Sequence, residues 1–285
     1  MEYSNPELPE GINTSKEHPL KEFFILTVGL LAVVFIVISV LILIVDNFAD
    51  KIPFEIEKDL PISSLLGNLD TEKLPPYLHK VSQKVLNTYE LPKDMNITFH
   101  YVNDDTVNAF ATLGGHIVLY RGLLEKLKYE DELAMVIAHE IAHVKYRHPI
   151  LSTSHGIIVG VVLSAVSASS GNTVINDLMG STGMASLMRF SRDFEYQADK
   201  DAINSLIKIY GHPKGALGLF KVFENESIDG LSFEFLTTHP LTKNRISKTT
   251  QVIKDNALNN LNTMIAYPSE FKLWLRQQKK NVKIK

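Results

Sequence analysis

The residues of this sequence that are best suited to chemistry lie in the segment His139-Glu140-Ile141-Ala142-His143. Side chains four residues apart share one face of a helix, so the two histidines can bind one metal ion together. Glu140 lies beside the first histidine, where its carboxylate can reach a water molecule on that ion and act as general base. The spacing therefore predicts a catalytic metal site for hydrolysis.

The flanking residues indicate that this segment is helical. Three acidic residues begin the helix at Glu130, and three basic residues end it at His148, directly before Pro149. This order suits the helix dipole, and proline stops a helix from continuing. Glu140 falls within the apolar face, where a carboxylate without a partner is costly. Its position favours a functional site over a surface pair of histidines.

A third metal ligand is expected downstream, because catalytic zinc usually has three protein ligands and a water molecule. Glu195 and Asp199 lie one turn apart in a second predicted helix that begins near Ser191. Two carboxylates at this spacing often face solvent, but beside the histidine pair we expect Glu195 to be a ligand. Asp199 is then expected to accept a hydrogen bond from a ligand imidazole.

The sequence has no cysteine, which excludes disulfides, cysteine-ligated zinc, iron–sulfur clusters and a cysteine nucleophile. The predicted cofactor is therefore one zinc ion per chain, bound by His139, His143 and Glu195. The choice of zinc over another divalent cation depends on the ligand types and on the family resemblance described next.

Four spaced blocks of sequence carry a family resemblance. They are Asn-Ala-Phe at 108–110 with the Gly-Gly pair after it, HEIAHVKYRH at 139–148, SRDFEYQAD at 191–199 and THPLTKNRI at 238–246. Together they resemble the membrane-associated zinc metalloendopeptidases that include the CAAX prenyl protease, the heat-shock peptidase HtpX and related mitochondrial and periplasmic quality-control peptidases. The resemblance implies the gluzincin arrangement, with His139, His143 and Glu195 as zinc ligands and Glu140 as catalytic base.

The resemblance also implies two further site residues and a strand that binds the substrate. His239 is implied to stabilise the oxyanion or to cap the zinc ion in a resting form, and Arg245 to support it. An oxyanion does need a donor or cation opposite the base. The strand before the metal helix is implied to be a sheet edge that pairs with extended peptide. The residues expected on this edge are Gly114, Gly115, His116 and Ile117.

An apolar run without charge at residues 23–45 predicts a membrane helix. As a helix it is about 35 Å long, enough to cross a hydrocarbon core of about 30 Å. A buried soluble helix normally carries a polar stripe, and a cleaved signal peptide has a shorter apolar core. We therefore expect an uncleaved membrane anchor. Lysines flank the run almost equally, and we expect the catalytic domain on the extracytoplasmic (periplasmic) side.

The anchor sets the predicted organisation of the chain. We expect a polar leader at 1–22, the anchor at 23–45, a juxtamembrane linker at 46–70, a zinc metallopeptidase domain at 71–265 and a C-terminal tail at 266–285, whose basic end from about Gln277 is solvated. The predicted fold class is α+β and mostly helical, a gluzincin-like domain with a small sheet beside the metal helix. Strand-like patterns occur at 96–102 and at 110–120, where Gly114 and Gly115 interrupt the second pattern.

Residues 150–188 contain one acidic residue and no lysine or arginine. Three interpretations compete: a buried helical hairpin, a lid over the cleft, and an element that touches the membrane. We favour the hairpin or the lid, because glycines and serines break the apolar pattern and leave it too short for a second span.

These patterns predict a membrane-anchored zinc endopeptidase that hydrolyses extended or misfolded membrane or envelope proteins. The alternative is a chaperone-like or gated quality-control factor that keeps the zinc site and cleaves little. Prenyl-protein processing is disfavoured, because its multi-span chamber needs several long apolar runs. The net charge of −3 gives no overall attraction to nucleic acid, so none is expected as a partner. The sequence gives no oligomeric state.

Overall fold

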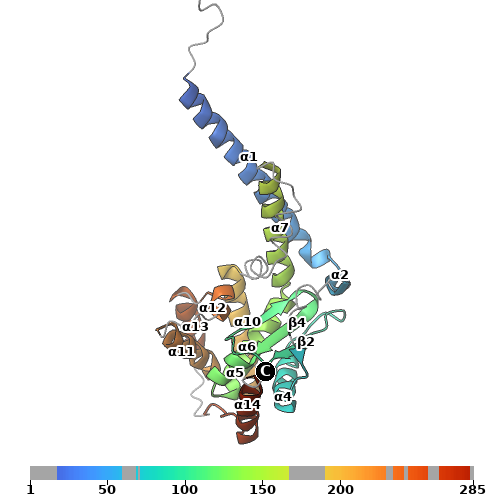
Figure 1. The fold of residues 1–285 in the computed structure, drawn as a ribbon, viewed down its shortest axis with the longest axis vertical. Helices are drawn as coiled ribbons and strands as arrows, with labels where there is room; N and C mark the ends of the chain where they lie inside the picture. The colour runs from blue at the N-terminus through green and yellow to red at the C-terminus, as the bar shows by residue number, and fades with distance from the viewer. Residues whose placement is uncertain are drawn as a thin grey trace, which may run out of the picture.

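The computed structural model describes residues 18–59, 69, 71–166, 190–228, 234–240, 243–255 and 263–282. Helices dominate these residues and pack around one small sheet (Figure 1). In chain order the elements are α1 (Pro19–Phe48), η1 (Ala49–Lys51), α2 (Phe54–Asp59), β1 (Thr71–Glu72), α4 (Pro76–Leu86), β2 (Thr98–Val102), β3 (Ala109–Thr112), η2 (Leu113–Gly115), β4 (His116–Tyr120), α5 (Arg121–Lys126), α6 (Glu130–Lys145), α7 (His148–Val166), α10 (Arg192–Tyr210), α11 (Lys214–Ile228), α12 (Glu234–Thr238), α13 (Lys243–Asp255) and α14 (Ser269–Val282). The predicted fold class, mostly helical with a small sheet, is confirmed.

The four strands form one mixed sheet in the order β1-β2-β4-β3. β2 and β4 run parallel, whereas β3 and β4 form an antiparallel hairpin around η2. His116 pairs with Thr98 on β2 and with Thr112 on β3, so β4 has a neighbour on both sides. The prediction that residues 114–117 form a free edge is therefore wrong. Among the described strands, β3 is the outer strand next to β4.

The Gly-Gly pair explains this strand order. Gly114 and Gly115 have φ angles of 71° and 79°, in the left-handed region that glycine adopts without steric cost. A Cβ atom on Gly115 would also lie 2.2 Å from the backbone oxygen of Asn96. The pair therefore makes a tight turn instead of extended strand, and the turn folds residues 109–112 onto the outside of β4.

The metal-motif helix α6 runs through the core and packs against α4, α10, α11 and β3. The Glu132 carboxylate caps its start by accepting hydrogen bonds from the backbone amides of Lys128 and Tyr129, at 2.8 and 3.2 Å. α6 ends at Lys145, earlier than predicted. Arg147, with a φ angle of 59°, turns the chain, and α7 begins at His148. Pro149 thus lies in the first turn of a new helix, where proline is favoured.

The described part of the predicted linker is docked on the domain. Phe54 of α2 is buried in the main core. Glu57 accepts a hydrogen bond from the backbone amide of Gly114 at 3.2 Å and forms an ion pair with Arg147 at 2.6 Å. Arg147 also donates to the backbone oxygen of Ile52 at 2.8 Å. The chain after α1 is therefore tied to the turn at the end of α6.

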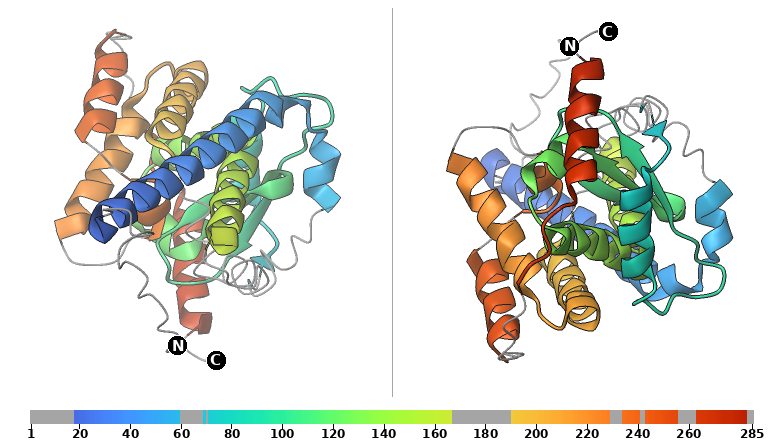
Figure 2. Two further views of the ribbon diagram at one scale, coloured as in Figure 1. Left: turned by 90° about the horizontal axis from the view of Figure 1, so that it is seen from above. Right: turned by 90° about the horizontal axis from the view of Figure 1, so that it is seen from below.

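α1 and α7 project together from one end of the domain (Figures 1 and 2). α1 has no buried residue and is the one described helix that is long and apolar enough to cross a membrane. α7 packs against α1. It accounts for the first part of the 150–188 segment, and residues 167–189 lie outside the described residues, so the hairpin and lid interpretations stay predictions.

The predicted C-terminal tail at 266–285 begins, in its described part, as a helix docked on the domain, whereas Lys279 and Lys280 near its end are exposed. Residues 269–282 form α14, and Phe271 and Leu275 on one face of this helix are buried in the core. Tyr267 is also buried, and its neighbour Ala266 bridges to Tyr129 at the start of α6. An apolar stripe at helical spacing docks this segment, and its basic residues occupy the other faces.

Candidate metal centre

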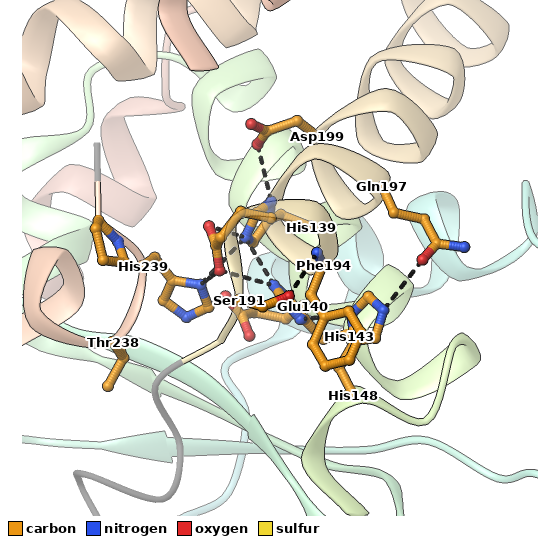
Figure 3. Close-up of polar contacts among 12 residues, drawn as sticks. His139, Glu140, His143, His148, Ser191, Phe194, Gln197, Asp199, Thr238 and His239 are labelled. Atoms are coloured by element: carbon orange, nitrogen blue, oxygen red, sulfur yellow. Dashed lines mark hydrogen bonds and ion pairs between the residues drawn. The ribbon is translucent and has the colours of Figure 1, made fainter. Parts of the chain in front are cut away.

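Four buried side chains converge within the domain, and Figure 3 labels the three histidines among them. They are His139 and His143 of α6, Glu195 of α10 and His239, which follows α12. One potential ligand atom from each of them lies within 4.8 Å of the others. The Nε2 atoms of the two α6 histidines are 3.0 Å apart, and each is 3.5 Å from a carboxylate oxygen of Glu195.

Local structure explains how Glu195 and His239 reach the α6 histidines. The Ser191 hydroxyl accepts a hydrogen bond from the backbone amide of Phe194 at 3.2 Å and caps α10. This start places Glu195 in the first turn of α10, which packs closely on α6. The His239 ring stacks on Phe235 of α12, with ring centroids 4.5 Å apart.

His139 is held by a charged neighbour. Its Nδ1 atom is 3.1 Å from the Asp199 carboxylate. Arg245 donates two hydrogen bonds of 2.8 Å to the same carboxylate and lies 2.5 Å from Glu195. Burial alone would raise the pKa of Asp199, but the Arg245 guanidinium holds it below its usual range. An ionised Asp199 fixes the proton of His139 on Nδ1 and leaves Nε2 free to face the cluster.

His143 is held by neutral neighbours. Its Nδ1 atom is 2.9 Å from Nδ1 of His148, and Nε2 of His148 is 3.2 Å from the Gln197 amide oxygen. Burial lowers the pKa of His148 to about 4, so this imidazole is neutral near pH 7. His148 then donates from Nε2 to Gln197 and accepts from Nδ1 of His143. This relay leaves Nε2 of His143 free to face the cluster.

The field of the cluster favours a cation. Burial alone would lower the pKa of His139, but hydrogen bonds to Asp199 and Glu195 raise it to about 10. The pKa of His143 moves the other way, well below its usual value, because of burial and the nearby His139. The carboxylates of Glu195 and Asp199 therefore stabilise positive charge at this site. Imidazole nitrogens and a carboxylate oxygen are also the donors that zinc prefers, so these residues fit a zinc ion.

Glu140 is fully buried beside this cluster. Its carboxylate has no side-chain hydrogen-bond partner among the described residues, and a hydrogen bond with the backbone of Ala111 offsets only part of the cost of burial. One oxygen is 3.5 Å from Nε2 of His239. Burial raises the pKa of Glu140, although His239 and His139 oppose the shift. A buried carboxylate without a side-chain hydrogen-bond partner is costly, and such costs are typical of functional sites.

Residues 72–253 match the family model of Peptidase family M48. The chain belongs to peptidase family M48. This membership confirms the enzyme class predicted from the sequence, a zinc metallopeptidase. The narrower resemblance to the CAAX prenyl protease and HtpX stays a prediction.

Three relatives illustrate what this M48 chain is similar to. The mitochondrial metalloendopeptidase OMA1 of Schizosaccharomyces pombe is 29% identical over 175 residues, which are 60% of this chain and 51% of that protein. The beta-barrel assembly-enhancing protease of Escherichia coli (strain K12) is 28% identical over 186 residues, 60% of this chain and 37% of that protein. A putative beta-barrel assembly-enhancing protease of Vibrio cholerae is 32% identical over 162 residues, 53% of this chain and 33% of that protein. The chain spans from one third to about half of the length of these relatives.

In this M48 chain the structure brings together seven of the predicted site residues. They are His139, Glu140, His143, Glu195, Asp199, His239 and Arg245. The predicted edge residues have other contacts. Gly114 donates its backbone amide to Glu57, and the His116 ring pairs with His100 of β2 at 2.7 Å.

His148 and Gln197, which form the relay behind His143, were not predicted as site residues. A signal for both was present: His148 closes the HEIAHVKYRH block, and Gln197 lies between Glu195 and Asp199 in the SRDFEYQAD block. His148 was interpreted only as one of the basic residues at a helix end. In the M48 structure it begins α7, and its ring stacks on Phe194 with centroids 4.1 Å apart.

Proposed function

We propose that this chain is a membrane-anchored, zinc-dependent endopeptidase that hydrolyses extended or misfolded membrane or envelope proteins. One zinc ion per chain is held by His139, His143 and Glu195. The observation that carries the proposal is the convergence of these three ligand atoms beside the buried carboxylate of Glu140, which has no side-chain hydrogen-bond partner among the described residues. Family membership and the names of the relatives support the same activity.

The residues around the ion have different roles in hydrolysis. A bound zinc ion supplies Lewis-acid chemistry, which acidifies water and polarises a carbonyl group. Glu140 takes the proton of the attacking water and passes it to the leaving amine nitrogen, a task suited to a carboxylate with a raised pKa. His239 lies across from Glu140 and donates a hydrogen bond toward the developing oxyanion. Arg245 positions Asp199 and Glu195.

We place the peptide-binding edge at β3 instead of β4. Two observations support this choice: β3 is the outer strand of the sheet, and it packs on α6, which carries the two ligand histidines and Glu140. Extended peptide can add to a sheet edge through main-chain hydrogen bonds, with little sequence selectivity. Such a mode suits misfolded substrates, whose backbone is accessible.

Residues 23–45, within α1, are the proposed anchor, and we place the catalytic domain on the extracytoplasmic side. The length and exposed apolar surface of α1 support the anchor. The proposed boundaries of the metallopeptidase domain are 71–265, extended by the docked helix α14.

A second candidate function is a gated or chaperone-like factor with little proteolysis. One contact favours it: Nδ1 of His239 lies 2.9 Å from Glu195 and 3.2 Å from Nε2 of His139, within the same cluster as the ligands. In this state His239 would be a fourth ligand and would close the position that water needs.

The test uses the full chain in detergent micelles, with casein as substrate and zinc measured per chain. We expect about one zinc ion in the wild type and in the Glu140→Gln variant, with casein cleavage lost only in the variant. Glu90→Gln, at an exposed glutamate, is the matched control and should cleave normally. No zinc in the wild type would refute the proposed site. Zinc without cleavage, restored by His239→Ala, would instead support the gated alternative.

A further inference from the structure

The helix α7 changes character along its length. Its first two turns contain serines, a threonine and two histidines. Residues 156–166 contain no charged side chain and one polar side chain, Ser164. We call residues 156–166 the apolar half of α7. The side chain of Ser164 in this half is satisfied, because its hydroxyl donates to the backbone oxygen of Gly160 at 2.7 Å. The apolar half therefore offers no charge or free hydroxyl of its own to water.

The polarity of α1 changes at the same level. Asp46 is the first charged residue after the apolar run of α1, and its carboxylate lies 2.6 Å from Nε2 of His155, the last polar residue before the apolar half. Figure 1 shows α7 extending from the domain along α1, back toward the N-terminal end of α1. α1 and α7 are distant in sequence but lie side by side, and both change from polar to apolar residues at the same level.

The two faces of the apolar half differ in burial. Gly160 and Ser164 are buried, whereas Ile157 and Val161, one turn apart, are 42% and 48% exposed. Apolar residues of α1 at the same end of the molecule are exposed too, Leu41 and Ile44 among them. Exposed apolar side chains on two packed helices are unfavourable in water and favourable in a bilayer.

We propose that the apolar half of α7 lies in the same bilayer as α1, with Ile157 and Val161 against the lipid acyl chains. A helix of this length reaches about 16 Å, roughly half of the hydrocarbon core, so α7 enters one leaflet without crossing it. The helical backbone satisfies its own hydrogen bonds there. The ion pair of His155 with Asp46 lies at the membrane surface.

This placement fixes the distance of the metal centre from the membrane. α7 begins at His148, which contacts the proposed ligand His143. At about 1.5 Å of rise per residue, the turns from His148 to His155 cover roughly 10 Å. The metal centre is therefore held close to the bilayer surface. The placement itself does not depend on peptidase activity, so it can fail or hold independently of the proposed function.

The absence of cysteine in the sequence allows a direct test. Ile157→Cys and Val161→Cys are made separately in the full chain, labelled with the fluorophore NBD and reconstituted in phosphatidylcholine vesicles. Val37→Cys in α1 is the lipid control, and Leu273→Cys, an exposed apolar position of α14, is the water control. Quenching is measured with doxyl-labelled phosphatidylcholine, and separately with iodide present on both sides of the membrane.

We expect doxyl lipid to quench the labels at 157 and 161 as strongly as the label at 37, while iodide quenches only the label at 273. Iodide quenching at 157 and 161 would place α7 in water and overturn the proposal. Protection from both quenchers would show that protein covers this face, a second copy of the chain included, and would overturn it as well. The labels at 157 and 161 are in separate variants, so the other variant still tests the proposal if one of them misfolds.

Discussion

The two histidines contributed by α6 to the cluster have neighbours of different kinds. His139 contacts the buried ion pair of Asp199 and Arg245, whereas His143 contacts the uncharged His148, which passes its hydrogen bond to the exposed side chain of Gln197. Both arrangements leave Nε2 facing the cluster. We call His139, Asp199 and Arg245 the charged side, and His143, His148 and Gln197 the neutral side. The charged side is buried, whereas the neutral side reaches the surface at Gln197, so a substitution on the charged side should cost more stability.

The largest effect is expected from Arg245→Met. This change leaves the carboxylates of Asp199 and Glu195 buried without their cation, and breaking a buried pair costs about 3–5 kcal/mol of stability. Urea unfolding of the zinc-depleted protein measures the loss. The matched control is Arg276→Met, at an exposed arginine of α14 that should be nearly neutral. Equal stabilities of the two variants would contradict the role of the charged side.

The neutral side is expected to make the stability of the protein depend on pH. The pKa of His148 is lowered by burial from 6.5 to about 4 in the folded protein, so the unfolded chain binds more protons between these values. Stability is thus fully present above pH 6.5 and falls as the pH drops toward 4, by on the order of 3 kcal/mol. The pKa of Asp199 is lowered from 3.8, so the charged side loses its contribution only at lower pH.

Urea unfolding of the zinc-depleted protein across pH 4–7 tests this difference. His148→Phe should make the profile shallower and leave the part of the slope that the lowered pKa of His143 contributes, and His79→Phe, at an exposed histidine, should leave the profile unchanged. A profile that keeps its full slope in the His148→Phe variant would assign the effect to another group.

A third effect concerns metal affinity on the charged side. Asp199→Asn removes the acceptor that fixes the His139 tautomer, and second-layer changes of this kind typically weaken metal binding by about 10–100-fold. Competition with a chromophoric chelator measures the zinc affinity. Asp193→Asn, at an exposed position of the same helix, is the control. Unchanged affinity in the Asp199→Asn variant would show that His139 needs no such acceptor.

The smallest effect is expected from the neutral side in the same assay. His148→Gln keeps a side-chain acceptor near His143 and should retain most of the affinity, whereas His148→Phe should lose about tenfold, the lower end of the range for such residues. The difference between the two variants is informative, because both replace the same ring. Equal affinities would mean that His148 only fills space.

Local patterns predicted more of the site than of the strand order. The spacing of His139, Glu140 and His143 and that of Glu195 and Asp199 follow from helical periodicity, which operates within one turn. The position of His116 was predicted wrongly, because the left-handed turn at Gly114 and Gly115 decides which strand lies outside, and strand order is a property of the whole sheet.

The remaining misses share a physical cause. His148 was assigned to the end of the metal helix, but Arg147 at positive φ turns the chain and lets His148 begin α7 beside His143. The apolar stripe of α14, with Phe271 and Leu275, is diluted by basic residues on the other faces, so residues 266–285 were assigned to a tail after the domain. Arg147 is held by Glu57 and Ile52, and α14 docks on the core, so both features depend on contacts between segments distant in sequence.

The central claim is that these two differently supported histidines and Glu195 bind one zinc ion and leave a position for water. Zinc K-edge X-ray absorption of the full chain as purified tests it most directly. We predict two imidazole nitrogens and a carboxylate oxygen at about 2.0–2.2 Å, together with a water oxygen, and the same spectrum in the His239→Ala variant. Three imidazoles in the wild type that become two in His239→Ala would contradict the open ligand set and make His239 a fourth protein ligand.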